Sequence, residues 1–175
     1  MPRLVLPPTG GAPTRRPATA ADDGLLLAIY ASTRADELDL VSWRPGERQA
    51  FERAQFLAQR RDWAARFPTA SHEVVELAGR GVGRLVTQVD DDRLLIVDVA
   101  LLPVARGKGV GTTLLGEVLD RADEACLPVR LQVESTNRAR RLYRRLGFEV
   151  VGRGATHLQM ERTPDANYAR RRERS

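Results

Sequence analysis

Residues 101–111 read LLPVARGKGVG and join a predicted strand to a predicted helix. An apolar run over residues 94–102 leads into this stretch, and residues 112–115 (TTLL) continue it as a helix. Glycines let the backbone turn tightly and approach a ligand closely, while the first N–H groups of a helix lack intrahelical partners and carry partial positive charge. Arg106 and Lys108 add charge of the same sign. The stretch therefore predicts a binding site for a diphosphate.

The glycine spacing separates this stretch from two common nucleotide-binding loops. Dinucleotide-binding folds carry G-x-G-x-x-G, and P-loops carry G-x-x-x-x-G-K-[ST]. Here no Lys-Ser or Lys-Thr pair follows the second glycine, and no strand–helix–strand unit precedes the loop. The alternative is a tight turn in which the glycines only redirect the chain, so the rest of the sequence has to decide.

Two periodicities alternate along the remainder of the chain. Helical spacing predicts four helices, at residues 22–31 (capped by Thr19 or Asp22), 45–67, 109–125 and 137–146, the last closed by Gly147. Alternating or continuous apolar residues predict seven strands, at residues 15–18, 72–78, 81–89, 93–102, 128–133, 148–152 and 156–161. The near-continuous apolar run of the fourth strand indicates that both of its faces are covered. This order predicts an α+β fold with a mixed sheet and helices packed on its faces.

Composition places the chain among globular proteins. Its 175 residues are 42% hydrophobic and 29% charged, which suits one domain. No apolar run is long enough to cross a membrane, and the proline-rich start does not resemble a signal peptide. The single cysteine, Cys126, is typical of a reducing compartment, so we expect a cytoplasmic protein in which Cys126 is a buried, inert thiol.

The net charge of +5 raises the question of nucleic-acid binding. Residues 1–21 hold three arginines and no acid, and residues 162–175 hold five arginines against two acids, so residues 22–161 carry a net charge of −1. Charge confined to the chain ends is typical of solvated tails, and no interleaved aromatic residues accompany it. We therefore do not expect nucleic acid to be the main partner.

Two motifs, in this order, resemble the GNAT superfamily of acyl-CoA-dependent N-acyltransferases. Arg106, Gly109 and Gly111 match all three fixed positions of that family's diphosphate signature, [RQ]-x-x-G-x-[GA]. Residues 139–148 (ARRLYRRLGF) are similar to its A-x-x-x-Y-x-x-x-G-F helix and strand, and residues 16–22 resemble its usual opening.

The resemblance covers about residues 15–162 and implies one GNAT-like domain there. Residues 1–14 would form a flexible lead, and residues 163–175 a basic, disordered tail. The implied fold is α+β, an α/β three-layer arrangement of a mixed, mostly antiparallel seven-stranded sheet with about four helices on its two faces.

In that family the loop binds the diphosphate of acetyl-CoA, and the end of the fourth strand pairs with the pantetheine arm. The cofactor-binding residues that the resemblance implies are Leu101, Leu102, Arg106, Gly107, Lys108, Gly109, Val110, Gly111, Thr112, Thr136, Asn137, Arg140 and Tyr143. The family commonly has Asn seven residues before the tyrosine, where this chain has Thr136 followed by Asn137, so either side chain is a candidate. Arg140 or Arg144 would contact the 3′-phosphate of CoA, unless this basic helix is simply a solvated face.

Acetyl transfer from a thioester to an amine needs a neutral amine, a held thioester, a stabilised oxyanion and a proton for the thiolate. The resemblance implies that the N–H of Leu101 or Leu102 contacts the oxyanion and that Tyr143 is the general acid. A phenol with a pKa of about 10 suits donation to a thiolate. The alternative for Tyr143 is a packing residue on an amphipathic helix.

Several acidic residues are candidates for the base or the acceptor site. Asp98 lies within an apolar strand, so it must be paired or functional, and both interpretations stay open. Glu37 and Trp43 lie between the first two predicted helices, in the segment with which the family covers the acceptor. Glu134 follows the fifth strand and could bind the amine instead.

The implied activity is direct transfer of an acetyl group from acetyl-CoA to the primary amine of a small molecule or peptide. Direct transfer is preferred because Cys126 lies away from the motifs. His72 and His157 have no partners at metal-ligand spacing, so no metal is expected. The alternative is a catalytically silent module that binds or senses acyl-CoA, and a homodimer is suggested by analogy alone.

Overall fold

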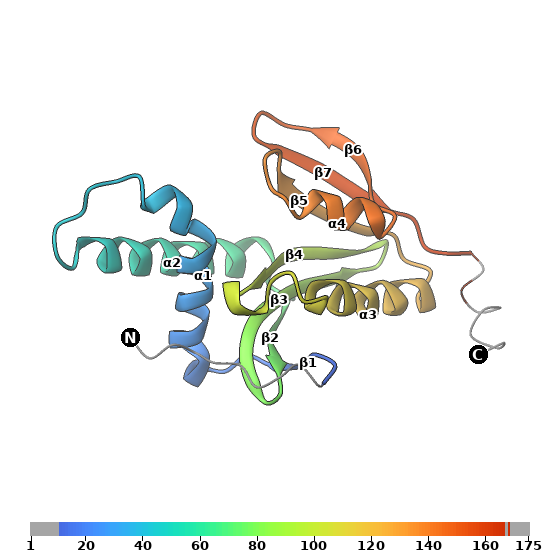
Figure 1. Ribbon diagram of the computed structural model, residues 1–175. Coiled ribbons are helices and arrows are strands. Elements are labelled where there is room, and N and C mark those ends of the chain that lie inside the picture. The colour runs from blue at the N-terminus through green and yellow to red at the C-terminus, as the bar shows by residue number, and fades with distance from the viewer. Residues whose placement is uncertain (1–10, 167, 169–175) are drawn as a thin grey trace. The chain divides into compact units, whose positions relative to one another are not determined.

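Residues 11–166 and 168, which the computed structural model describes, form seven strands and four α-helices (Figure 1). The strands form one sheet in the order β1-β2-β3-β4-β5-β7-β6. The elements are β1 (Thr14–Pro17), α1 (Asp23–Leu38), α2 (Glu47–Arg66), β2 (Ser71–Leu77), β3 (Arg80–Asp90), β4 (Arg93–Leu101), α3 (Val110–Glu124), β5 (Val129–Glu134), α4 (Arg140–Arg145), β6 (Glu149–Arg153) and β7 (His157–Arg162), with 3-10 turns η1 (Ala20–Asp22) and η2 (Pro103–Ala105). The predicted fold class is confirmed.

The sheet is mixed because β4 and β5 run parallel, whereas β1–β2, β5–β7 and β6–β7 are antiparallel. Parallel neighbours cannot be joined by a hairpin and need a crossover connection. Residues 102–109 and α3 supply it. The glycine-containing loop therefore lies, by topology, at the carboxyl end of β4.

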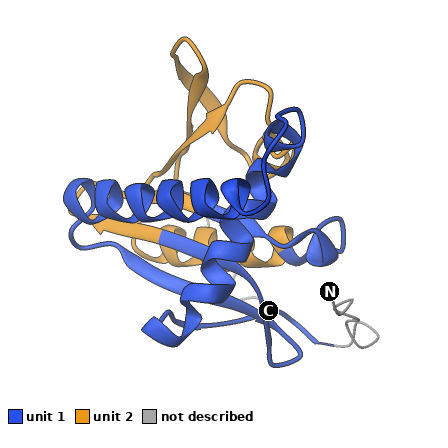
Figure 2. Cartoon of the chain, turned by 90° about the vertical axis from the view of Figure 1, so that its left-hand side faces the viewer, with its two compact units in different colours: residues 1–86, 99–110 blue, residues 87–98, 111–175 orange. Residues whose placement is uncertain are grey.

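Two compact units divide the chain (Figure 2). The first contains residues 1–86 and 99–110, and its core comes from α1, α2, β2 and β3, with Ile29, Val74 and Leu85 among the fully buried side chains. The second contains residues 87–98 and 111–175. Its core includes one face of α3 and the inward side chains of β5 and β7, among them Leu114, Leu115, Val118, Leu119, Ala122, Val129, Leu131, Val133, Leu158 and Met160.

The first helix is longer than predicted. It continues seven residues beyond Ala31, to the buried Leu38. The hydroxyls of Ser32 and Thr33 each donate to the carbonyl three residues earlier, at 2.7 Å, so both are satisfied within the helix. Because the helix extends to Leu38, Glu37 lies in the last turn of α1 and not in the following connection.

The expectation of a buried Cys126 is wrong, because its side chain is exposed. The helix α3 ends at Glu124, and Cys126 then takes a left-handed backbone conformation with φ 54°. Its N–H donates to the carbonyl of Asp123 at 3.1 Å. The chain has thus left the buried face of the helix before it reaches the cysteine.

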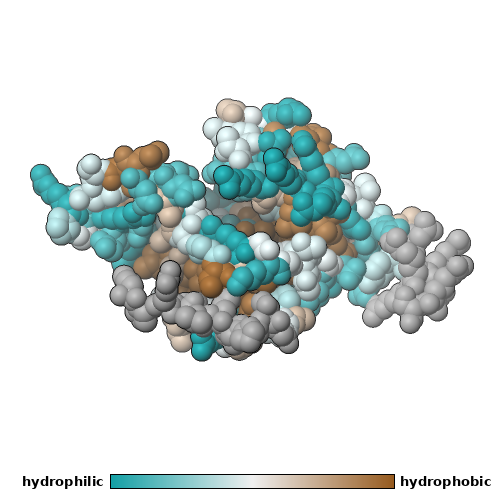
Figure 3. Space-filling view, viewed as in Figure 1, coloured by the Kyte–Doolittle hydropathy of each residue, from teal (hydrophilic) through white to brown (hydrophobic). Residues whose placement is uncertain are grey.

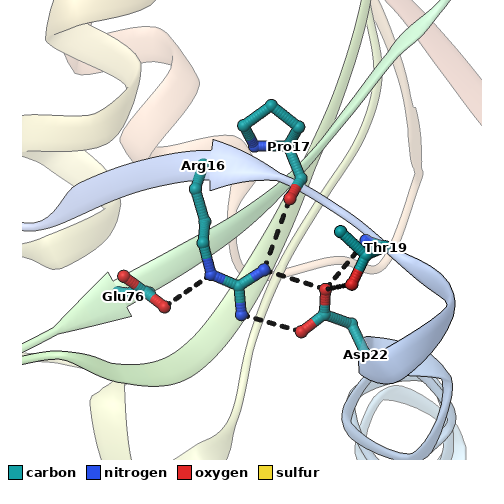
Figure 4. A network of polar contacts seen from close by, with 5 residues as sticks. All are labelled: Arg16, Pro17, Thr19, Asp22 and Glu76. Atoms are coloured by element: carbon teal, nitrogen blue, oxygen red, sulfur yellow. Dashed lines mark hydrogen bonds and ion pairs between the residues drawn. The ribbon is translucent and has the colours of Figure 1, made fainter.

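A polar network joins β1 to the start of α1 and to β2 (Figure 4). Arg16 donates to both carboxylate oxygens of Asp22, at 2.8 and 2.7 Å, and to Glu76 at 2.8 Å. The N–H and hydroxyl of Thr19 donate to Asp22 Oδ2 at 2.8 and 3.0 Å. These bonds, with the one from Arg16 foremost, hold the pKa of Asp22 well below its usual value. Of the two predicted capping residues, Asp22 holds the N-cap position of α1, but its carboxylate bonds Arg16 and Thr19 and no N–H of the helix.

A second carboxylate fastens the C-terminal part of the domain. Asp123 on α3 is 5% exposed and accepts two hydrogen bonds from the guanidinium of Arg162, at 2.8 and 2.9 Å. It also accepts the backbone N–H of Asp165 at 2.8 Å. The segment predicted as a tail therefore begins with residues that contact α3, while residues 1–10, 167 and 169–175 lie outside the described structure.

Candidate functional site

The loop between β4 and α3 contains two glycines with left-handed backbone conformations. After η2, Arg106 is extended, and φ is 72° at Gly107 and 80° at Gly109. A Cβ placed on either glycine would meet no atom within 4 Å, so the space beside both is open. Side chains with a Cβ rarely adopt this conformation. The loop thus presents bare backbone where the sequence predicts an anion.

The first turn of α3 follows without interruption. Val110 is buried and anchors the helix, whereas Gly111 is half-buried and Thr112 is exposed. The helix has 15 residues, long enough for its N-terminal N–H groups and dipole to favour an anion. Lys108 is exposed, and its ammonium has no hydrogen-bond or ion-pair partner among the described residues. These features fit the diphosphate of a CoA molecule.

The guanidinium of Arg106 is bound to other parts of the protein. Its Nε donates to the carbonyl of Leu101, the last residue of β4, at 2.8 Å. Its Nη2 donates to the carbonyl and to the hydroxyl oxygen of Ser32 in α1, at 3.2 and 3.1 Å. Arg106 therefore links the loop to the strand before it and to the first helix.

The end of β4 distinguishes the two N–H groups predicted to face the oxyanion. The N–H of Leu102 donates to the carbonyl of Val82 at 2.8 Å, so it is committed to the neighbouring strand. The N–H of Leu101 therefore stays the candidate for the contact to the oxyanion.

Gly83 in β3 is a residue that the sequence prediction missed. A Cβ at this position would lie 2.6 Å from the carbonyl oxygen of Ala100 and 2.5 Å from the Leu101 side chain. Only glycine allows β3 to approach the end of β4 this closely. The signal was present, because a glycine within an apolar strand often marks close approach of another backbone.

The parallel pairing of β4 with β5 is short. Leu94–Ile96 pair with Val129–Leu131, although β4 continues to Leu101 and β5 to Glu134. Asp98 follows directly after the paired residues and is partly buried. As predicted, the side chains of β4 are covered, since none of its nine residues is exposed.

Tyr143 is placed by the way in which α4 ends. Gly147 is left-handed with φ 87°, its N–H donates to the carbonyl of Arg144 at 3.1 Å, and the N–H of Phe148 donates to that of Tyr143 at 3.0 Å. These two bonds define a Schellman motif. Its usual apolar contact is the pair of rings of Tyr143 and Phe148, whose centroids are 5.8 Å apart. The A-x-x-x-Y-x-x-x-G-F pattern is therefore also a helix-termination signal.

The surroundings of the phenol keep it protonated. Tyr143 is 7% exposed. Burial, and secondarily the negative charge of Asp98, raises its pKa to about 12. A tyrosine in this setting is a hydrogen-bond donor throughout the neutral range.

The turn between β5 and α4 holds three further predicted residues. Asn137 Oδ1 accepts the N–H of Ala139 at 2.8 Å, which delays the helix by three residues relative to its predicted start. Arg140 donates to the carbonyl of Ser135, so its side chain braces the turn. Thr136 is exposed.

The predicted acceptor residues lie at separate points. Glu134, the last residue of β5, is exposed. Glu37 forms an exposed ion pair with Arg34, at 2.6 Å. Trp43 donates its indole N–H to the carbonyl of Leu38 at 2.9 Å and so folds back the connection between α1 and α2.

That connection carries exposed apolar side chains. Leu40 is 88% exposed and Val41 is 51% exposed, and Figure 3 shows apolar atoms gathered over this part of the surface. The ring of Trp43 lies 5.3 Å from that of Phe51.

Two other features, a metal centre and a membrane-spanning helix, are absent from the described residues. No group of three or more His, Cys, Asp or Glu side chains there could hold a metal ion. No helix in that part of the chain combines the length and the apolar composition needed to cross a membrane.

Comparison with solved structures shows the same fold in several proteins. The paia N-acetyltransferase from Thermoplasma acidophilum, in complex with coenzyme A, is 15% identical, with a TM-score of 0.66 over 87% of this chain and 99% of that chain. A protein from Corynebacterium glutamicum described as histone acetyltransferase HPA2 and related acetyltransferase is 26% identical, with a TM-score of 0.64 over 89% and 98%. The ribosomal-protein-S18-alanine N-acetyltransferase from Escherichia coli is 18% identical, with a TM-score of 0.57 over 88% and 96%.

Comparison by sequence assigns the family. No curated protein matches the chain. The family model described as Acetyltransferase (GNAT) family matches residues 32–148, which is more than half of the chain and includes both the loop before α3 and α4. This chain belongs to the GNAT family of acetyltransferases.

Proposed function

We propose that this protein transfers an acetyl group from acetyl-CoA to a primary amine by direct attack of the amine on the thioester. The observation that carries the proposal is the loop before α3. Its two exposed, left-handed glycines leave open space beside bare backbone at a helix N-terminus, within a sequence that matches the family signature. Backbone N–H groups of residues 107–112 would bind the diphosphate, and Lys108 would add a charge.

The remaining contacts to CoA follow the family pattern residue by residue. Thr136 or Asn137 would contact the pantetheine arm, and the side-chain amide N–H groups of Asn137 stay available because its oxygen serves Ala139. For the 3′-phosphate, Arg144 is favoured over Arg140, since Arg144 is exposed while Arg140 braces the preceding turn.

The reaction forms one C–N bond and breaks one C–S bond. The amine nitrogen attacks the thioester carbonyl, whose oxygen would be stabilised by the N–H of Leu101. When the C–S bond breaks, Tyr143 donates a hydrogen bond to the leaving sulfur. A thiol has a pKa of about 8.5, well below that of Tyr143, so full transfer of the phenol proton is uphill. The proton that ends on the thiol therefore comes, in net balance, from the attacking amine.

A separate proton must leave before the attack, because a primary amine is in its ammonium form near neutral pH, with a pKa of about 10, and a base must free its lone pair. Asp98 is the first candidate, since its charge acts on Tyr143 and it lies just beyond the paired part of β4. Glu37 and Glu134 are the alternatives. The pairing of Glu37 with Arg34 argues for a lesser role.

The acceptor is an amine of a small molecule or of a peptide. The solved neighbours include a ribosomal-protein-S18-alanine N-acetyltransferase, so this fold serves at least one protein acceptor. The exposed Leu40 and Val41, close in sequence to Trp43, favour an acceptor with an apolar part.

Two measurements test the proposal. Calorimetric titration with CoA should show binding to the wild-type protein, and absence of binding would overturn it. A panel of amines is then mixed with acetyl-CoA and followed by free thiol, with mass spectrometry of the product. Binding of CoA without thiol release from any amine would instead indicate a silent acyl-CoA-binding module.

A further inference from the structure

Arg106 occupies the first fixed position of the diphosphate signature, yet three of its five N–H donors are bonded within the protein. A guanidinium has five N–H groups. The single Nε–H is bonded to Leu101, and the two on Nη2 are bonded to the carbonyl and hydroxyl oxygens of Ser32. A bidentate phosphate contact needs two donors on one edge of the guanidinium, and both usable edges include Nη2. Arg106 could therefore bind phosphate in this way only by releasing Ser32.

The hydroxyl of Ser32 is oriented to accept from Arg106. Its one proton is donated to the carbonyl of Ile29 at 2.7 Å, so towards Nη2 the hydroxyl oxygen can act only as an acceptor. The neighbouring Thr33 makes the same kind of bond within the helix, to Tyr30 at 2.7 Å, but has no bond to Arg106. Ser32 is thus the position in this turn of α1 that connects the helix to the loop.

We propose that Arg106 is a positioning residue that holds the CoA loop and the end of β4 against α1, and that it makes no bidentate contact to the diphosphate. The inference rests on the proposed function. Through its bond to Leu101, Arg106 fixes the strand end that carries the proposed oxyanion N–H. Through Ser32 it fixes the helix whose last residue, Leu38, accepts the indole N–H of Trp43. The acceptor-side connection and the CoA loop are therefore joined by one side chain.

Lysine at position 106 separates the two roles of the arginine. An ammonium keeps the charge but lacks the planar fork, so it cannot bond Leu101 and Ser32 at once in the same geometry. If Arg106 acts as a brace, Arg106→Lys should weaken CoA binding about 10-fold, much like Arg106→Ala, and Ser32→Ala, which removes one of the three bonds, about 3-fold. The double variant Arg106→Ala/Ser32→Ala should be no weaker than Arg106→Ala, because both changes break the same contact.

The experiment is calorimetric titration of each full-length variant with CoA at low and high salt. Thr33→Ala is the matched control, since it removes an equivalent hydroxyl bond from the same helical turn, and it should bind CoA as the wild type does. Lys108→Ala is the charge control and should flatten the salt dependence of affinity, as expected for an exposed phosphate contact. Arg106→Lys and Arg106→Ala should leave that dependence unchanged.

The opposite pattern would overturn the inference: Arg106→Lys with nearly wild-type affinity, and Arg106→Ala with a flattened salt dependence and no coupling to Ser32→Ala. Thermal unfolding without CoA identifies any variant that fails to fold. If Arg106→Ala does not fold, the CoA affinity of Arg106→Lys, the smaller change, is compared with that of the wild type. Failure of the wild-type protein to bind CoA would refute the proposed function and is distinct from either result.

Discussion

Replacing Tyr143 by phenylalanine removes the phenol hydroxyl and leaves the ring. The ring closes the Schellman motif against Phe148, so Tyr143→Phe should fold normally and bind CoA within about threefold of the wild type. General acid catalysis contributes about 10²- to 10⁴-fold. Because a phenol with a pKa of about 12 only shares its proton with a thiolate, we expect the lower end, a fall in kcat of about 100-fold.

The raised pKa also fixes the pH dependence. With a pKa of about 12, only a small fraction of Tyr143 should be ionised at pH 10, where about half of a tyrosine in water is ionised. The ratio of wild-type to Tyr143→Phe turnover should therefore stay constant from pH 7 to about pH 10. Below pH 10 the buried phenol contributes its full stabilisation. As the pH rises from about 10 to 12, the unfolded chain loses this proton first, so the contribution is lost over that window.

Turnover is measured as free thiol released with the best amine of the panel. The pKa is measured by ultraviolet titration of tyrosinate, as the difference between wild type and Tyr143→Phe; the chain has three tyrosines. Tyr30→Phe is the matched control, because Tyr30 is equally buried at 7% exposure but lies on α1. Undiminished turnover in Tyr143→Phe, or ionisation of Tyr143 near pH 10, would refute the reasoning.

Three further substitutions test the loop and its supports. Gly109→Ala should weaken CoA binding about 10-fold, because alanine disfavours φ 80° by about 1–2 kcal/mol, whereas Gly116→Ala within α3 should leave binding intact and slightly raise the melting temperature; equal affinities by calorimetry would contradict this. Asp123→Asn should lower the free energy of unfolding by about 2 kcal/mol, since it removes the charged partner of the half-buried Arg162; urea titration measures this with the exposed Asp120→Asn as control, and an unchanged free energy of unfolding would contradict it. Gly83→Ala forces a Cβ to within 2.6 Å of a backbone oxygen and should lower both stability and turnover, so a variant with wild-type melting temperature and kcat would show that the strands can adjust.

The sequence was sufficient for the order of elements because each signal was local. The Gly147 termination signal and the residue types around the crossover loop depend only on neighbouring positions, and all of the predicted helices and strands are present. The error at the end of α1 arose because Ser32 and Thr33 are poor helix formers in isolation, whereas here their hydroxyls bond to the helix itself. Cys126 was misplaced for a similar reason, since its position depends on where α3 stops.

The candidate site was harder to predict, because its contacts join distant parts of the chain. Arg106 could be recognised from the signature, but its bond to Ser32, 74 positions away, could not. The bond between Leu102 and Val82, which makes Leu101 the better oxyanion candidate, likewise depends on strand pairing. Residue type and spacing thus identify the candidate residues, and the tertiary contacts show which of them are already bonded to other parts of the protein.

The short pairing of β4 with β5 affects how the protein behaves without its ligand. The paired register of these interior strands ends at Ile96, and a ligand that hydrogen-bonds the end of β4 would lie beyond that point. Strand edges are templates on which other extended chains can assemble. A pantetheine arm lying there would act as a substitute strand. Ligand-free preparations should therefore aggregate more readily on storage than preparations saturated with CoA, and light scattering of the two would show how far the solubility of this protein depends on a bound CoA.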